Sequence, residues 1–155
     1  MEESGLLLID KERGPTSADV IRVISRLIGK KHKIGHAGTL DPDGEGLLVV
    51  LIGDATKLSE TVMDMPKIYS ALFHFGVTTD TYDATGQVTA SADASTLTAE
   101  RIRAAMPAFT GCIQQAPPAF SAIKIKGKRA YELARDGKAP EIQAREAWVY
   151  EFELK

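Results

Sequence analysis

Cysteine and long apolar runs are scarce in this chain of 155 residues, and their scarcity excludes several kinds of protein. Cys112 is the single cysteine, so the chain has no internal disulfide and no CxxC pair for zinc. The longest apolar run is Leu47–Ile52, whereas a membrane-spanning helix needs about 20 such residues. Leu6–Ile9 follows an acidic N-terminus and is too short for a secretory signal peptide. We therefore expect a cytoplasmic protein with no membrane segment.

Familiar cofactor motifs are also missing. The sequence has no GxxxxGK[ST] loop for a nucleoside triphosphate, no GxGxxG turn for a dinucleotide and no GxSxG elbow for a serine nucleophile. His32, His36 and His74 are not at the spacing of a zinc site. The acidic segment Asp80–Gly86 lacks the alternating carboxylates and closing glutamate of a calcium loop. We expect neither a metal nor a cofactor.

The composition is that of one ordinary globular domain. Hydrophobic residues make up 44% of the chain and charged residues 26%, which excludes wholesale disorder and low-complexity structure. A chain of this length buries roughly two-thirds of the surface that it exposes when unfolded. Since no repeat, linker or shift in composition divides it, we expect a single unit over residues 1–155.

Charge is segregated along the chain although the net charge is only −2. That net value argues against strong nonspecific binding to nucleic acid. The first basic cluster contains Arg22, Arg26, Lys30, Lys31 and Lys33, and the second contains Lys124, Lys126, Lys128 and Arg129. The middle of the chain is acidic. Charge alone leaves two interpretations open, a solvated basic face and a surface that holds phosphates.

Apolar periodicity predicts strands and a helix in the first part of the chain. Gly5–Asp10 and Leu47–Ile52 have the pattern of strands, and Thr16 with Asp19 resembles a capping box for a helix that ends at Gly29. The apolar face of that helix consists of Val20, Ile21, Ile24, Leu27 and Ile28. A short helix capped by Asp54, carrying Leu58, Val62 and Met65, is expected to end at Pro66.

The rest of the chain mixes further strands with short helices. Strands are expected at Lys67–Val77, Gln87–Ala90, Phe120–Ile125 and Trp148–Leu154, and helices at Thr98–Phe109 and in a short stretch that ends at Gly137. The returns resemble hairpins rather than a strict alternation of strand and helix. This pattern indicates an α+β or mixed α/β fold, with a mainly antiparallel sheet flanked by short helices.

The segment from Ile34 to Gly46 is the strongest candidate for chemistry. Its four glycines and one proline predict an ordered loop in which the backbone can approach a ligand closely. Aspartate before proline is common in plain turns, so Asp41 alone proves little. However, His36 and Thr39 would orient a substrate, and the loop leads directly into a buried strand. A carboxylate held in this way is suited to attack an electrophilic carbon or to accept a proton.

The residues Gly35–Pro42 (GHAGTLDP), followed by Gly46–Leu48, resemble the catalytic motif of the TruB-type tRNA pseudouridine synthases. Other stretches resemble the family in the same order, over essentially the whole chain. They are Leu8–Lys11 with Gly14, Thr16 and Ser17, then Gly53–Lys57, Lys67–Tyr69, Gly76–Asp83, and Pro117–Lys124 with Gly127, Lys128 and Tyr131. Gly76–Asp83 is similar to the bacterial form of the family.

The resemblance implies isomerisation of a uridine in the T arm of tRNA (position 55) to pseudouridine, without metal or cofactor. Asp41 aligns with the essential carboxylate, which either attacks the nucleotide covalently or removes a sugar proton. Tyr69 aligns with a tyrosine that packs against the target base, although by pattern alone it is a core aromatic residue. His36 aligns with a histidine that supports base flipping, and Lys11 with a lysine that buttresses the site.

Substrate-binding residues are predicted from the resemblance and the two basic clusters together. They are Lys11, Lys30, Lys31, Lys33, His36, Gly38, Thr39, Lys124 and Lys128. The lysines would contact tRNA phosphates, giving affinity rather than base specificity.

The resemblance also implies that residues 1–155 are the N-terminal part of a catalytic domain. The later catalytic segments of the family and its C-terminal RNA-binding domain find no match here, so the pseudouridine synthase fold would be incomplete at its C-terminal end. We expect an unpaired apolar edge near Trp148–Leu154, a missing segment that acts as a separate partner chain, and little or no activity from this chain alone.

Two alternatives remain at the level of sequence. The chain would be a noncatalytic RNA-binding or chaperone module if it kept the surfaces that face tRNA without the chemistry. It would instead be a small glycosidase-like hydrolase if Asp41 worked with a nearby carboxylate, Asp43 or Glu45.

Overall fold

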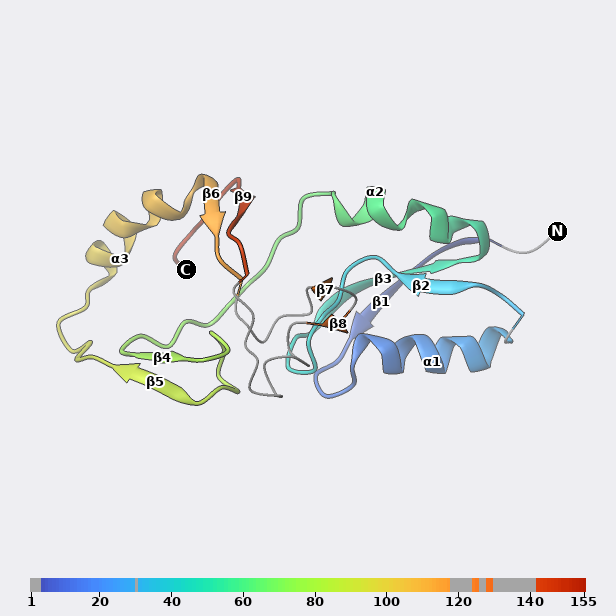
Figure 1. Cartoon of the computed structure of the whole chain (residues 1–155), viewed down its shortest axis with the longest axis horizontal. Helices are drawn as coiled ribbons and strands as arrows, with labels where there is room; N and C mark the ends of the chain where they lie inside the picture. The colour runs from blue at the N-terminus through green and yellow to red at the C-terminus, as the bar shows by residue number, and fades with distance from the viewer. Residues whose placement is uncertain (1–3, 30, 118–123, 126–127, 130–141) are drawn as a thin grey trace. The chain divides into compact units, whose positions relative to one another are not determined.

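The computed structural model describes residues 4–29, 31–117, 124–125, 128–129 and 142–155. The chain divides into two compact units, Met1–Ser70 and Ala71–Lys155, where the sequence predicts one (Figure 1). The division is invisible in the composition because the boundary falls in an apolar stretch, not in a polar linker. In both units the architecture is mixed α and β with small antiparallel sheets, as the sequence predicts.

The first unit is built on a three-stranded antiparallel sheet of order β1-β3-β2. Its elements are β1 (Gly5–Lys11), α1 (Ser17–Ile28), β2 (Ile34–His36), β3 (Gly46–Ile52), the 3-10 helix η1 (Gly53–Leu58) and α2 (Ser59–Met63). The register pairs Lys11 with Gly46 at one end and Gly5 with Ile52 at the other. Figure 1 shows α1 and α2 on opposite sides of this sheet.

Helix α1 begins and ends as its sequence predicts. Thr16 is the N-cap: its hydroxyl accepts a hydrogen bond from the Asp19 amide at 3.1 Å, and the Asp19 carboxylate accepts one from the Thr16 amide at 2.9 Å. This reciprocal pair confirms the capping box. Gly29 follows the last turn at φ +87°, a conformation that glycine adopts without steric cost.

The core of the first unit lies between α1 and the sheet. Ile24 of α1 packs against Leu48 and Val50 of β3, and all three are buried. Val20, Ile21 and Ile28 pack around them, which confirms four of the five residues predicted on the inward face of the helix; Leu27 is the exception, 80% exposed.

The second unit consists of separate two-stranded antiparallel sheets and one helical segment. Its elements are β4 (Val77–Thr79), β5 (Val88–Ser91), α3 (Ala99–Ala105), the 3-10 helix η2 (Met106–Phe109), β6 (Gly111–Gln115), β7 (Lys124–Ile125), β8 (Lys128–Arg129) and β9 (Arg145–Val149). The pairs are β4–β5, β6–β9 and β7–β8. The predicted return near Gln87–Ala90 is confirmed as β5. Met106 is the one buried apolar residue among those described in this unit.

Two predicted strands differ from the structure because they lack a neighbour to pair with: one is absent, and the other is confirmed only at Trp148 and Val149, which belong to β9. Lys67–Phe75 is not a strand, because none of its backbone groups is paired within the described chain, and a strand needs partners for its N–H and C=O groups. The predicted strand Trp148–Leu154 ends at Val149 instead. Val149 pairs with Gly111, the first residue of β6, so no partner continues beyond it.

Smaller differences concern the elements around Asp41 and Asp54. The predicted loop opens with a strand, β2, because Ile34–His36 pairs with β3. Asp54 does not cap a helix: its carboxylate pairs with the Lys57 ammonium at 2.5 Å, and a 3-10 turn precedes α2. The predicted short helix ending at Gly137 and most of the strand at Phe120–Ile125 lie outside the described residues.

None of the described helices combines the length and apolar character required to cross a bilayer; α1, with 12 residues, is the longest.

Candidate active site

The Asp41 loop connects β2 to β3 at the end of the sheet where β1 stops and α1 starts. The register that pairs Lys11 with Gly46 places the loop beside the turn between β1 and α1. Asp41 is exposed. Its backbone carbonyl accepts a hydrogen bond from the Gly44 amide at 3.0 Å, which closes a turn over Pro42 and Asp43. The carboxylate is therefore presented to solvent on a short, tight turn, neither buried nor used as a helix cap.

Three contacts hold this loop against the β1–α1 segment. The Gly14 amide donates to the Pro42 carbonyl at 2.7 Å. The Ser17 hydroxyl accepts from the Leu40 amide and donates to the Leu40 carbonyl, both at 2.9 Å. The Lys11 ammonium donates to the Gly44 carbonyl at 2.6 Å. Each contact is made to a main-chain atom of the loop, so the Asp41 side chain stays available while its backbone is fixed from both sides.

Lys11 is a buried support and not a surface cation. Only 1% of the residue is exposed, and its ammonium donates to the carbonyls of Gly44 and Glu12 at 2.6 and 3.0 Å. A buried charge is tolerated when its donors find acceptors in this way. Of the two roles expected for Lys11, the geometry supports the buttressing role. An ammonium directed at these carbonyls is poorly placed to contact a phosphate.

His36, Gly38 and Thr39 lie just before Asp41, so the structure brings these predicted residues into one loop. His36 is half-buried at the end of β2, and its Nδ1 lies 2.6 Å from the Gly38 carbonyl. Because a carbonyl only accepts, Nδ1 carries a proton and donates it to this hydrogen bond. Gly38 has φ +107°, a backbone conformation that favours glycine. Thr39 is exposed.

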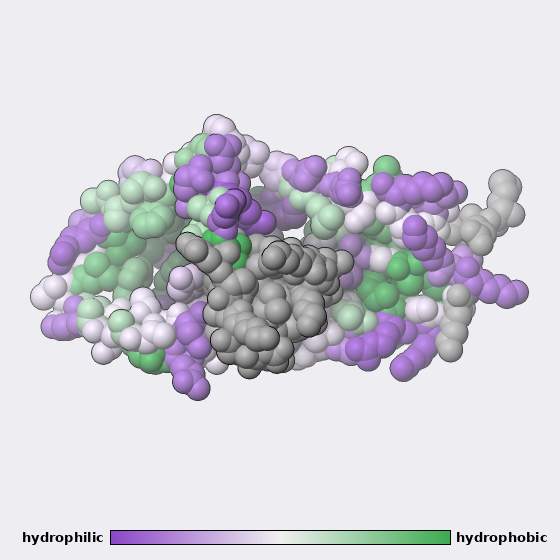
Figure 2. Space-filling view, in the orientation of Figure 1, coloured by the Kyte–Doolittle hydropathy of each residue, from purple (hydrophilic) through white to green (hydrophobic). Residues whose placement is uncertain are grey.

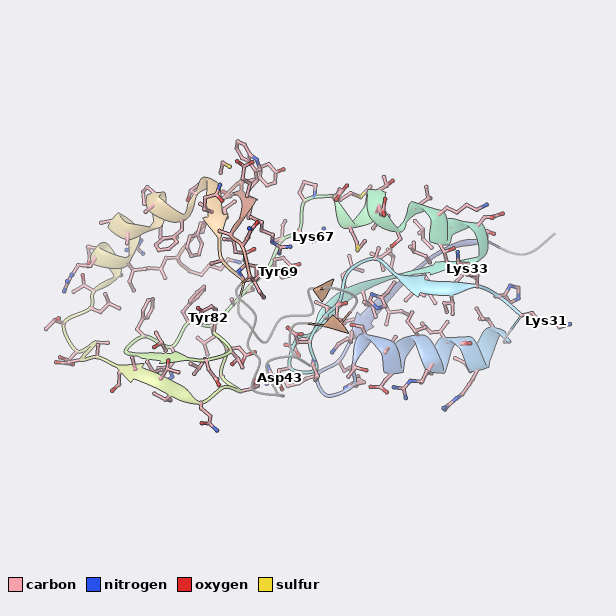
Figure 3. All side chains as sticks on the ribbon, in the orientation of Figure 1. Lys31, Lys33, Asp43, Lys67, Tyr69 and Tyr82 are labelled. Carbon is pink, nitrogen blue, oxygen red and sulfur yellow. The ribbon has the colours of Figure 1, made fainter. Side chains whose placement is uncertain are left out.

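Tyr69 is not brought against the Asp41 loop. It lies in the extended segment after α2 and is 72% exposed. Figure 3 shows it well apart from Asp43, its labelled neighbour of the loop. The pattern-based interpretation of Tyr69 as a core aromatic residue is wrong for this structure, because the strand that would have buried it does not form.

The first basic cluster lies at the other end of the first unit. Lys33 precedes Ile34, which pairs with Ile52, while the Asp41 loop joins β3 at Gly46. Seven residues of strand place these ends about 20 Å apart. Figure 3 shows Lys31 and Lys33 at the end remote from Asp43. Lys30 and the side chains of Lys124 and Lys128 lie outside the described part of the chain.

The acidic segment Asp80–Gly86 is organised by its own hydrogen bonds. The Asp83 carboxylate accepts from the hydroxyls of Thr85 and Thr81 at 2.6 and 2.7 Å and from the Thr85 amide at 2.8 Å. These bonds, led by that of the Thr85 hydroxyl, lower the pKa of Asp83. Asp80 accepts from the Gln87 amide at 2.8 Å. Within the described ranges, no group of three or more His, Cys, Asp or Glu side chains is arranged to hold a metal ion.

The family model described as TruB family pseudouridylate synthase (N terminal domain) matches residues 26–155 of this sequence. The chain belongs to the TruB family. It is 46% identical to the tRNA pseudouridine synthase B of Cereibacter sphaeroides over 151 residues, which cover 97% of this chain and 50% of the relative. It is also 46% identical to the Aquifex aeolicus protein of the same name over 150 residues, covering 97% of this chain and 52% of the relative.

This TruB-family chain spans about half the length of the curated relatives it matches. Its fold is similar to a chain in a solved structure described as a Cbf5-Nop10-Gar1 complex, with a TM-score of 0.56 and 25% sequence identity. That similarity covers 97% of this chain and 36% of the other. The predicted family and fold are therefore confirmed.

Ser17 is the residue of the TruB site that sequence reasoning missed as a functional candidate. It lies at the first position of α1, is buried, and binds both backbone groups of Leu40. The adjacent hydroxyl residues Thr16 and Ser17 could have indicated this role. Once Thr16 caps the helix, a second small hydroxyl at the next position is unexplained by capping and is free to bind another segment.

Proposed function

We propose that this chain carries the aspartate of a tRNA pseudouridine synthase and acts on the T-arm uridine at position 55. The observation that supports the proposal is the exposed Asp41 on a turn fixed by three contacts to its main chain. Membership of the TruB family supplies the reaction class, and the curated relatives bear the name tRNA pseudouridine synthase B. Catalysis by a carboxylate depends on its placement at the reacting nucleotide, and a fixed backbone provides that placement.

The proposed reaction breaks the N1–C1′ glycosidic bond, turns the base, joins C5 to C1′ and releases the proton from C5. Atoms balance without an external reagent. Asp41 would act on a uridine turned out of the RNA stack, either as a nucleophile or as a base for a sugar proton. His36, half-buried three residues before Thr39, would assist entry of the nucleotide. Tyr69, which is 72% exposed, would pack against the base.

The proposed substrate is tRNA, bound through phosphates by exposed lysines. Lys31 and Lys33 lie about 20 Å along the sheet from the Asp41 end, so they would contact the RNA backbone away from the target uridine. Lys30, Lys124 and Lys128 belong to the same proposal, with Gly38 and Thr39 beside the nucleotide. A tRNA substrate also implies a cytoplasmic location.

We further propose that residues 1–155 correspond to the N-terminal portion of the catalytic domain. Because the relatives are about twice as long, the complete active site would include groups from the half that this chain does not span. This chain alone should therefore turn over tRNA weakly or not at all.

The test is tritium release from unmodified tRNA labelled at C5 of uridine. The assay uses this chain alone and this chain mixed with the uncovered half of the Aquifex aeolicus relative. Asp41→Asn should lower the turnover of the active preparation at least 1,000-fold, since general acid–base and covalent roles contribute on the order of 10²–10⁴ or more. Asp43→Asn is the matched control, an exposed carboxylate on the same turn, and should change turnover less than fivefold.

Binding separates this proposal from the alternatives. Both variants should retain the wild-type dissociation constant for tRNA at one fixed salt concentration. Binding without tritium release by any preparation would favour a noncatalytic RNA module. Release of free uracil would instead indicate a hydrolase, and equal losses in the two variants would remove Asp41 from its catalytic role.

A further inference from the structure

Asp41 lies between two peptide groups, and hydrogen bonds fix both of them. On its N-terminal side, the Leu40 carbonyl accepts from the Ser17 hydroxyl at 2.9 Å. On its C-terminal side, the carbonyl of Asp41 itself accepts from the Gly44 amide at 3.0 Å. The orientations of these two peptide groups set φ and ψ of Asp41, which are the soft backbone angles of a residue. Together the two bonds therefore fix the direction in which the Asp41 side chain leaves the backbone.

Ser17 is the partner that ties this geometry to the rest of the first unit. The Gly44 amide belongs to the same turn as Asp41, so its bond shapes the turn without placing it. Ser17 belongs to α1 and precedes Leu40 by 23 positions. The other two contacts from the β1–α1 segment reach the loop only after the aspartate, at Pro42 and Gly44. Of these three contacts, Ser17 alone holds the chain that enters Asp41.

The chemistry of the contact requires a hydroxyl. Ser17 donates to the Leu40 carbonyl and accepts from the Leu40 amide, both at 2.9 Å, and a hydroxyl group can do both at once. Only 2% of Ser17 is exposed. Losing the hydroxyl would leave the two Leu40 groups without this partner, so they would have to move to find water. Thr16 provides the helix cap, so the contact with Leu40 is separate from capping.

Helix α1 is a firm base for this contact. Its first turn is closed by the capping box, and Ile24, two turns further on, is buried against Leu48 and Val50 of β3. Figure 2 shows hydrophilic residues, in purple, along the helix and apolar residues, in green, between the helix and the strands. A residue at the first position of such a helix has little freedom to move, so it can fix what it binds.

We propose that Ser17 is a positioning residue, which directs the Asp41 carboxylate toward the target nucleotide by fixing the Leu40–Asp41 peptide group. This role rests on the proposed function of Asp41. Because Ser17 is buried, it acts through the backbone and not by touching RNA. Displacement of a catalytic group by about 1 Å can slow a reaction about 100-fold. Loss of the hydroxyl should therefore lower kcat and leave tRNA binding intact.

The first test measures the order of Asp41 in this chain, without any reaction. In Ser17→Ala, ¹⁵N relaxation should show that the order parameter of the Asp41 amide falls from about 0.85, typical of rigid backbone, to below about 0.6. Ile24→Val is the matched control: it destabilises the same unit by removing one buried methyl group but makes no contact with the loop. The order parameter of Asp41 should be unchanged in this variant.

The second test measures tritium release from labelled tRNA by the preparation that is active with the wild-type chain. Ser17→Ala should lower kcat about 10–100-fold, because the carboxylate is misplaced in part of the population. Its KM and its dissociation constant for tRNA should change by less than about twofold, since uniform binding is untouched. Ile24→Val should change all three quantities by less than about twofold.

Four outcomes would overturn the positioning role. The first is an unchanged order parameter of Asp41 in Ser17→Ala, and the second is an equal fall in Ile24→Val. The third is a loss of activity that appears in KM and not in kcat, and the fourth is turnover that is lost in Asp41→Asn but kept in Ser17→Ala. Absence of turnover, or turnover that survives Asp41→Asn, would instead overturn the proposed function and this role with it.

Discussion

The two units differ in how far they bury their apolar side chains. In the first, α1 covers the sheet, and Ile24, Leu48 and Val50 form a closed core. In the second, Met106 is the one buried apolar residue described, and Phe73, Trp148 and Phe152 face solvent. Length does not explain the contrast, since the units have 70 and 85 residues. The difference is that the helix and strands of the first unit pack on one another, whereas the sheets of the second unit stay two-stranded within the described chain.

The largest expected difference between the units is in the cost of truncating one large side chain. Leu48→Ala removes a buried side chain from the core of the first unit and should destabilise that unit by about 2–5 kcal/mol. Phe73→Ala removes a larger but exposed side chain and should cost less than about 0.5 kcal/mol in the isolated chain. Urea unfolding followed by circular dichroism measures both. Equal costs would mean that the units are packed alike.

Ser17→Ala tests whether the Asp41 loop gains its order from the first unit. The substitution leaves the amide and carbonyl of Leu40 without their partner and should destabilise the unit by about 1–3 kcal/mol. Hydrogen exchange at the Leu40 amide should accelerate by at least tenfold. Ser25→Ala in the same helix is the control and should be neutral or slightly stabilising, because alanine is the better helix former. An unchanged exchange rate of the Leu40 amide in Ser17→Ala would contradict the conclusion that Ser17 fixes the backbone of the loop.

The N-caps of α1 and α3 allow a second comparison of the two units, with smaller expected changes in stability. Thr16 takes part in a reciprocal capping box, whereas the Thr98 hydroxyl accepts one long bond, 3.4 Å, from the Arg101 amide. Thr16→Ala should therefore cost about 1 kcal/mol, and Thr98→Ala a few tenths. Helicity at 222 nm during urea unfolding reports both. A larger loss for Thr98→Ala would reverse the ranking of the two units.

The smallest expected effect is a local pH response at Asp83 in the second unit. The pKa of Asp83 is lowered in the fold by hydrogen bonds from Thr85 and Thr81. A lowered folded pKa gives stability that is present above the unfolded value and is lost as the pH falls through the folded value. The protection factor of the Thr85 amide, its exchange rate relative to an unstructured amide at the same pH, should therefore fall in acid below that range. Asp83→Asn should abolish this pH dependence; an identical response in the variant would assign it to another group.

The sequence predicts local structure well where the residues of the segment itself carry the pattern. The capping box of α1, the strand β3 and the hairpin return at β5 all depend on short-range patterns, and all form. The strand expected at Lys67–Val77 fails because alternation predicts a surface to be buried but not the segment that buries it. The same limit applies to Tyr69, whose place depends on that strand.

The candidate site divides along similar lines. Glycine density and the aspartate identify the loop, and the family motif points to His36 and Thr39. Sequence alone does not show that Ser17 and Lys11 hold Leu40 and Gly44, because these contacts join residues 23 and 33 positions apart. Burial of Lys11 is equally hidden, since lysine is rarely found inside proteins.

The hydrogen bonds that fix the Asp41 loop are made to its backbone atoms, which leaves its exposed side chains open to engineering. The β1–α1 segment binds the backbone atoms of Leu40, Pro42 and Gly44. The exposed side chains of Thr39, Asp43 and Glu45 make none of these contacts. They can be randomised as a cassette without shifting the carboxylate between them. A library at these three positions would therefore vary the side chains around Asp41 while its backbone stays in place.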